Sequence, residues 1–268
     1  MLFCYQHHFQ IAYDRVGTGC PLVLLHGFCE DRTMWADFVP LLSEKYTVLT
    51  LDLSGFGASD LLPESSMAAM AAAVYAVWQH EQLPPMVLIG HSMGGYVGLE
   101  LAKQHPDCLL GLGLLHSHPF EDLPDKKVNR EKPIHFIQRH GIAPFVGQFI
   151  RNLFPAAFVQ QHTELIEALI DQTSVQRANA DIAASYGMLQ RPATAEVLRQ
   201  LPCPALLIIG TEDQAIAGEH RYGQLALPPV ASVHILEGIG HMAHLEAPAE
   251  TLEYLVDFIE FCVAATTP

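Results

Sequence analysis

Short, uninterrupted apolar runs that alternate with helical patterns are the feature that most constrains the fold of this chain. The runs are strand-length stretches dominated by Val, Ile and Leu, at Leu22–Leu25, Thr47–Leu51, Val87–Ile89, Leu109–Leu115, Leu206–Ile209 and Ser232–Leu236. Such runs are typical of strands covered on both faces. Helical patterns lie around them at Trp35–Ser43, Ser66–Glu81, Met93–Gln104 and Pro248–Cys262. This alternation predicts an α/β fold with a doubly wound, mostly parallel sheet. The mixed stretch Phe3–Arg15 predicts a hairpin on the sheet edge.

One long segment interrupts the alternation. From about Ser117 to Pro202 no strand pattern is found, and the segment is rich in aromatic residues. Its helical patterns fall at Lys127–His140, Pro144–Leu153, Thr163–Thr173 and Val175–Leu189. We therefore predict a core made of residues 1–116 and 203–268 and an inserted helical cap, or lid, at 117–202. The aromatic residues are expected to form the core of the cap, with some of them lining a pocket.

Composition excludes several classes of function. The formal net charge of −15 disfavours nucleic-acid binding. The six cysteines have no CxxC or zinc-finger spacing, so we expect reduced thiols and no disulfide framework. The longest apolar run, Met67–Trp78, has twelve residues, and about twenty are needed to cross a bilayer. No basic segment followed by an apolar one begins the chain, so a cytoplasmic protein without a membrane partner is expected. Oligomeric state is not readable from the sequence.

The strongest local motif is Gly90-His91-Ser92-Met93-Gly94-Gly95, which joins a predicted buried strand to a predicted helix. A serine at such a sharp turn has a strained backbone, and neighbouring side chains with a β-carbon would collide there. The glycines of the motif remove those collisions. The start of the helix also directs its positive dipole end towards the serine. Ser92 is therefore the candidate nucleophile; its alternative role is that of an ordinary helix N-cap.

An acid and a histidine follow this serine in the order that serine nucleophiles on a strand-to-helix turn require. Asp213 lies beyond the predicted strand Leu206–Ile209, and His241 lies beyond Ser232–Leu236. Because catalytic groups of open α/β sheets gather at the carboxyl ends of strands, we expect these side chains to converge with Ser92. Glu212 competes with Asp213 for the role of the acid, and His244 competes with His241 for that of the base. Position in the motifs favours Asp213 and His241.

The motifs together resemble the α/β-hydrolase family, in its capped esterase and C–C-bond hydrolase branch. The resemblance runs from Pro21 to the C-terminal helix and is weakest in the cap. Its marks are Leu25-His26-Gly27-Phe28, Asp52-Leu53-Ser54-Gly55-Phe56-Gly57-Ala58-Ser59, Gly90–Gly95, Gly210–Asp213 and Gly240-His241. It implies an oxyanion hole built from the backbone N–H groups of Phe28 and Met93. It also implies two-step acyl transfer on a small-molecule ester, with no metal or cofactor.

The remaining histidines and glycines have structural interpretations. His26 is expected to shape the loop that follows it by bonding to the backbone, and His91 to pack under the serine turn. His116 and His118 are two residues apart without a third ligand, so a metal site is not expected. The pair Gly55 and Gly57 lacks the third glycine of a dinucleotide site and is interpreted as a turn.

Several functions remain open at this point. Dehalogenases and epoxide hydrolases of similar fold use an aspartate nucleophile, which Ser92 argues against. C–C-bond hydrolases often carry asparagine before the serine, so His91 favours an esterase. Perhydrolysis is compatible with the same three residues, and a hydrolase-fold ligand receptor with little turnover can retain them. For an esterase we expect a small, largely apolar substrate.

Overall fold

The computed structural model describes residues 1–265. Eight strands form one sheet in the order β1-β2-β4-β3-β5-β6-β7-β8. The strands are β1 Leu2–Gln6, β2 Phe9–Val16, β3 Pro21–Leu25, β4 Thr47–Leu51, β5 Met86–His91, β6 Leu109–Leu115, β7 Ala205–Gly210 and β8 Ala231–Leu236. β1 and β2 form the expected edge hairpin, and β2 pairs antiparallel with β4; all other pairings are parallel. The predicted α/β fold is confirmed.

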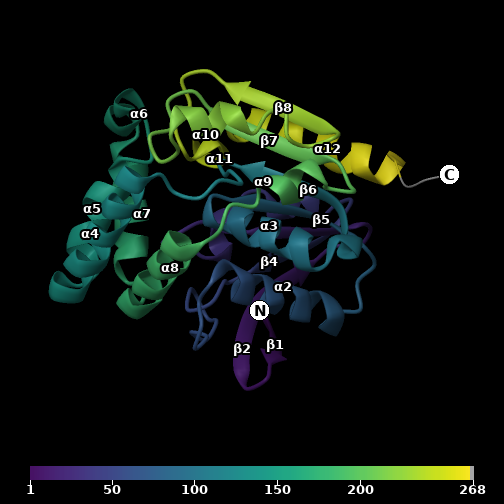
Figure 1. Ribbon diagram of the computed structural model, residues 1–268, viewed down its shortest axis with the longest axis horizontal. Helices are drawn as coiled ribbons and strands as arrows, with labels where there is room; N and C mark the ends of the chain where they lie inside the picture. The colour runs from purple at the N-terminus through teal and green to yellow at the C-terminus, as the bar shows by residue number, and fades with distance from the viewer. Residues whose placement is uncertain (266–268) are drawn as a thin grey trace.

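Helices cover both faces of this sheet (Figure 1). Val23, Leu49 and Leu88 face a core shared with α2 Met67–His80 and α3 Met93–Gln104. Their neighbours Leu24 and Val48 face the opposite core, which includes α12 Pro248–Ala265. Alternate residues of one strand therefore feed two cores, and this explains why both must be apolar.

The segment between β6 and β7 is helical in the structure. It contains α4 Pro124–His140, α5 Ala143–Arg151, α6 Ala156–Gln161, α7 Thr163–Ser174, α8 Ala178–Gln190 and α9 Ala195–Arg199. α4 to α8 project from one end of the sheet (Figure 1). A third hydrophobic cluster joins this segment to the core of the molecule, since Ile137, Val146 and Ile150 pack with Cys29 and Met242.

Two predictions about single elements were wrong. The predicted helix at Trp35–Ser43 is a 3-10 turn, η1 Arg32–Trp35, followed by a single helical turn, α1 Val39–Leu42. Pro40 explains this difference, because proline has no N–H and is tolerated only in the first turn of a helix. The strand at Ser232–Leu236 was expected to be covered on both faces, but β8 is the edge strand and leaves Val233 and Ile235 exposed.

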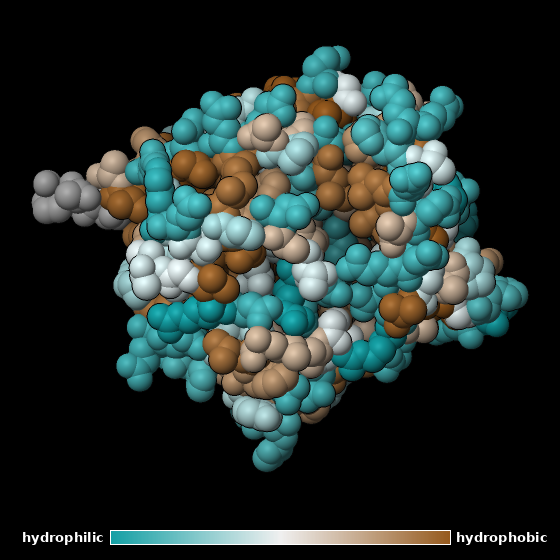
Figure 2. All heavy atoms as spheres, turned by 180° about the vertical axis from the view of Figure 1, so that it is seen from behind, coloured by the Kyte–Doolittle hydropathy of each residue, from teal (hydrophilic) through white to brown (hydrophobic). Residues whose placement is uncertain are grey.

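The remaining helices, α10 Gly218–Gly223 and α11 Ala243–Glu246, lie in the loops around β8. All six cysteines are free thiols. Within residues 1–265, no helix combines the length and apolar character that a bilayer crossing requires. Figure 2 shows small apolar patches interrupted by polar side chains on the face opposite to that of Figure 1.

Candidate active site

Ser92 lies on the sharp turn between β5 and α3, at φ 48° and ψ −110°. This left-handed φ is uncommon for a residue with a side chain and is characteristic of strained functional turns. The turn is crowded: a β-carbon on Gly90 would lie 2.3 Å from main-chain atoms of Gly94. Main-chain bonds hold it in place, since the Ser92 N–H donates to the Leu115 carbonyl at 2.9 Å. The Ser117 hydroxyl donates to the Ser92 carbonyl at 2.8 Å.

The strand order explains where this turn is placed. The chain passes from β3 to β4, the neighbour of β3 at one edge, and then crosses over to β5, the neighbour of β3 at its other edge. Such a reversal creates a crevice at the carboxyl ends of β3 and β5, where open α/β sheets bind ligands. The loops that carry Phe28 and Ser92 both begin at this point.

Asp213 and His241 meet in a buried hydrogen bond, from His241 Nδ1 to Asp213 Oδ2 at 2.7 Å. The other carboxylate oxygen, Oδ1, accepts from the backbone N–H groups of Ala215 and Ile216 at 2.8 and 3.1 Å. Burial by itself would raise the pKa of Asp213, but its electrostatic interactions with His241 and His116 and the hydrogen bond from His241 hold it well below its ordinary value. Asp213 is therefore ionised at neutral pH.

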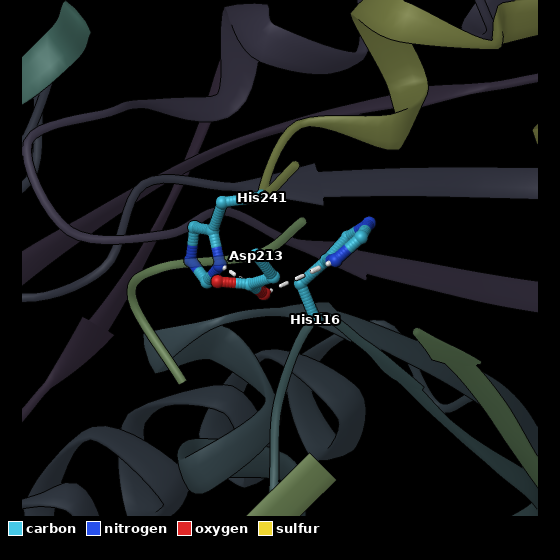
Figure 3. Close-up of side chains that lie close together, drawn as sticks. All are labelled: His116, Asp213 and His241. Atoms are coloured by element: carbon cyan, nitrogen blue, oxygen red, sulfur yellow. Dashed lines mark hydrogen bonds and ion pairs between the residues drawn. The ribbon is translucent and has the colours of Figure 1, made fainter. Parts of the chain in front are cut away.

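His116 is a third member of this cluster (Figure 3). Asp213 lies between the rings of His241 and His116, and His116 Nδ1 is 3.4 Å from the same Oδ2 atom. His116 Nε2 accepts from the Ala243 N–H at 3.3 Å, which places the ring proton on Nδ1, facing the carboxylate. Burial lowers the pKa of His116 to about 4, so the ring is neutral at pH 7. No sequence motif indicates this role of His116.

These three residues offer possible metal-ligand atoms within 4.8 Å of one another. The Asp213–His241 hydrogen bond and the contact of His116 Nδ1 with the same carboxylate account for this grouping. His118, considered above as a possible partner of His116, instead bonds the Tyr96 hydroxyl at 3.2 Å.

Ser92 and His241 both line a small cavity of about 90 Å³. We call this the inner cavity, and Phe28, Tyr96, Met188 and Ile216 are among its other walls. A larger, more open cavity of about 610 Å³, the outer cavity, lies between α4 and α5. The two cavities share the lining residues Phe28, Lys126, Arg130, Phe149, Leu153 and Ala215. The two cavities are therefore adjacent, and together they extend from the helical segment to the serine.

Glu212 and His244, the alternatives to Asp213 and His241, and the neighbouring His26 have surroundings that differ from those of the favoured acid and base. Glu212 is exposed, whereas Asp213 is buried. His244 is buried against Trp35 and His91, and burial lowers its pKa to about 3. His26 bonds the backbone on both sides, through the Gly27 carbonyl at 2.7 Å and the Leu53 N–H at 2.9 Å. This is the structural role expected for His26.

His91 does more than fill space under the turn. Its Nε2 donates to the main-chain carbonyl of His241 at 2.9 Å, and its Nδ1 donates to Glu30 Oε2 at 2.9 Å. The Glu30 carboxylate also accepts from the Gly27 N–H at 2.9 Å. Since a carbonyl and a carboxylate are both acceptors, His91 carries two protons and forms an ion pair with Glu30. This pair connects the loops after β3, β5 and β8, and Glu30 has no motif that could have identified it.

The His91–Glu30 pair gives a pH-dependent contribution to stability. Burial would lower the pKa of His91, but Glu30 raises it; burial would raise the pKa of Glu30, but His91 lowers it to about 2. The contribution of His91 to the free energy of unfolding is full below about pH 6.5 and is lost as the pH rises through the raised pKa of His91. The contribution of Glu30 is full above about pH 4.5 and is lost as the pH falls towards 2.

We therefore predict that Glu30→Gln lowers the free energy of unfolding by about 3 kcal/mol between roughly pH 4.5 and 6.5. The difference from wild type should shrink on either side of that window. Urea denaturation across a pH series measures it, with the exposed Glu64→Gln as the matched control. A difference that does not vary with pH would contradict the ion pair.

The family of the chain is shown by its similarity to known proteins. Residues 22–254 match the model of the alpha/beta hydrolase family, so the chain belongs to that family and is an α/β-hydrolase enzyme. It is 28% identical over 247 residues, 89% of this chain and 91% of the relative, to 2-succinyl-6-hydroxy-2,4-cyclohexadiene-1-carboxylate synthase of Enterobacter sp. (strain 638).

Two further similarities are of comparable strength. The chain is 30% identical over 248 residues to the dihydrolipoyllysine-residue acetyltransferase component of the acetoin cleaving system of Pseudomonas putida, and the match covers 90% of this chain but only 64% of that longer protein. Among solved structures, a thermophilic esterase from Thermogutta terrifontis superposes with a TM-score of 0.88 at 29% identity, covering 95% of this chain and 94% of that one.

Proposed function

We propose that the protein hydrolyses a carboxylic ester, or a similar acyl bond, by a Ser92-His241-Asp213 triad through an acyl-enzyme. The observation that carries the proposal is the buried Asp213–His241 hydrogen bond, on a histidine that shares the inner cavity with the strained Ser92. This arrangement suits nucleophilic catalysis, in which a base activates the serine and an acid orients the base.

The proposed steps follow from the contacts. Asp213 accepts the Nδ1 proton of His241, which leaves Nε2 unprotonated to take the proton of Ser92. The serine oxygen attacks the ester carbonyl, and the oxyanion is stabilised by the backbone N–H groups of Phe28 and Met93. Met93 begins α3, so its N–H has no acceptor within the helix. The alcohol leaves with the proton, and water activated by His241 then releases the acid.

In this account the helical segment at 117–202 acts as a cap that shapes the substrate site. Two observations support this role. The outer cavity lies between α4 and α5, and the His241 N–H donates to the carbonyl of Leu153, a residue just after α5. Apolar side chains from α4, α5 and the loop after β3, among them Phe136, Phe145, Phe149 and Phe28, line the outer cavity. We propose short-to-medium acyl chains as the group that binds there.

A series of nitrophenyl esters from acetate to decanoate tests the proposal. We expect kcat/KM to rise about threefold to fourfold per methylene over the first few members, because each buried methylene contributes about 0.8 kcal/mol. A rate independent of acyl length would contradict the apolar acyl site. Failure to hydrolyse any member would contradict the esterase function and favour C–C-bond hydrolysis or a receptor role.

A further inference from the structure

The walls of the two cavities are positively charged, although the whole chain carries a net charge of −15. Besides His91, which is paired with Glu30, three cations line them: Lys126 and Arg130 line both cavities, and Lys132 lines the outer one. Among the described residues that line either cavity, the only acid is Glu30, which is paired with His91. A substrate that reaches Ser92 by this route therefore meets a local charge opposite to that of the molecule as a whole.

The pairing of Arg130 does not cancel this charge. Asp122 accepts from Arg130 Nε at 2.6 Å, but it also accepts from Arg191 Nη2 at 2.8 Å. One carboxylate is thus shared by two guanidinium groups. Together with Lys126, the two guanidinium groups carry three positive charges. Asp122 supplies one negative charge, so these four side chains have a net charge of +2. The Glu121–Lys127 pair on the outer surface is neutral by itself.

Lys126 has hydrogen-bond donors that can bind a ligand. Its ammonium group has three N–H donors, and one of them bonds the Ala215 carbonyl at 2.6 Å. Within residues 1–265 it forms no ion pair with an acidic side chain. Lys126 and Arg130 are four residues apart on α4, so they lie on the same face of that helix. Because the site is partly shielded from water, charge–charge attraction there is stronger than at an exposed surface.

Building on the hydrolase function proposed above, we propose that Lys126 and Arg130 bind an anionic group of the substrate, so that the natural substrate is an ester carrying a carboxylate or a phosphate. The apolar walls from Phe28, Phe145 and Phe149 accommodate the chain between that anion and the ester carbonyl. The reacting bond then lies at Ser92 in the inner cavity.

Calorimetric binding to the full chain carrying Ser92→Ala tests this proposal without turnover. The probes are adipate, hexyl phosphate and the neutral dimethyl adipate, at low ionic strength. We expect one or both anions to bind more tightly than the neutral diester. We also expect Lys126→Met to weaken anion binding by about 10- to 100-fold, the usual effect of removing a charged hydrogen-bond donor. The stronger anion identifies the group as a carboxylate or a phosphate.

Two further variants separate charge recognition from a structural role of Lys126. Lys126→Arg keeps the charge and is expected to retain most of the anion affinity. Lys127→Met is the matched control, since Lys127 is paired with Glu121 and lines neither cavity. Equal binding of anions and the diester, or equal weakening of all three by Lys126→Met, would overturn the proposal.

The same experiment distinguishes this inference from the proposed function. If wild-type protein hydrolyses nitrophenyl esters but the Ser92→Ala protein shows no preference for anions, the charge recognition fails and the hydrolase function stands. If anions bind through Lys126 but no ester is hydrolysed, the hydrolase function fails and the anion site stands.

Discussion

Replacement of Ser92 by alanine is expected to lower kcat for nitrophenyl esters by about 10⁵- to 10⁶-fold. Without the hydroxyl no acyl-enzyme can form, and only substrate binding and the proposed oxyanion stabilisation by the Phe28 and Met93 N–H groups remain. The variant should fold, because the main-chain bonds of the turn to Leu115 and Ser117 do not involve the Ser92 side chain. Steady-state kinetics with circular dichroism spectra of both proteins measures this effect.

Ser66→Ala provides the control for this prediction. Ser66 caps α2 by accepting from the Ala69 N–H at 3.2 Å and lines neither cavity. Its replacement should cost about 1 kcal/mol of stability and leave kcat unchanged. A Ser92→Ala protein that retained more than about 1% of wild-type kcat would exclude Ser92 as the nucleophile, since loss of a nucleophile costs far more than a factor of 100.

The second large effect is expected for Asp213→Asn, which should lower kcat by about 10⁴-fold. The two backbone N–H groups of Ala215 and Ile216 would hold the amide oxygen, as they now hold Oδ1. The amide NH₂ would then face His241 and His116. Because the NH₂ group donates, His241 would turn to the tautomer with its proton on Nε2, which cannot accept the proton of Ser92.

His116 strengthens this prediction. Because His116 Nε2 accepts a bond from the Ala243 N–H, the ring proton of His116 is on Nδ1. A second N–H group therefore already faces the position of the carboxylate. An amide there would meet two N–H groups, and its rotation would lose the bonds to Ala215 and Ile216. The exposed neighbour Glu212→Gln is the matched control and should retain wild-type kcat. A larger loss of kcat for Glu212→Gln than for Asp213→Asn would show that Glu212, and not Asp213, is the acid that orients His241.

The sequence was most informative where local chemistry determines structure. The buried strands and the turn at Gly90–Gly95 were predicted because both impose residue types that few other structures require. The convergence of Asp213 with His241 followed from topology, since both residues follow parallel strands. The prediction failed at Trp35–Ser43, where Pro40 interrupts a segment whose pattern otherwise fits a helix, and at β8, whose apolar residues did not reveal its position on the sheet edge.

The remaining parts of the site depend on contacts between distant segments. Glu30 and His91 are 61 residues apart in the chain, and their pairing requires the loops after β3 and β5 to lie side by side. The contacts of Lys126 with the cavities depend on how α4 packs over the core, which no local pattern specifies. The role of His116 depends on a left-handed backbone at φ 48°, which turns its ring towards Asp213.

Acid-quenched mass spectrometry of the intact protein during the first turnover of nitrophenyl butyrate tests the central claim most directly. We predict a burst of nitrophenol together with a butyryl adduct, located on the peptide that contains Ser92 and absent from the Ser92→Ala protein. Rapid nitrophenol release without an adduct on Ser92 at any time in the burst, or an adduct on another residue that persists in Ser92→Ala, would contradict the proposed mechanism.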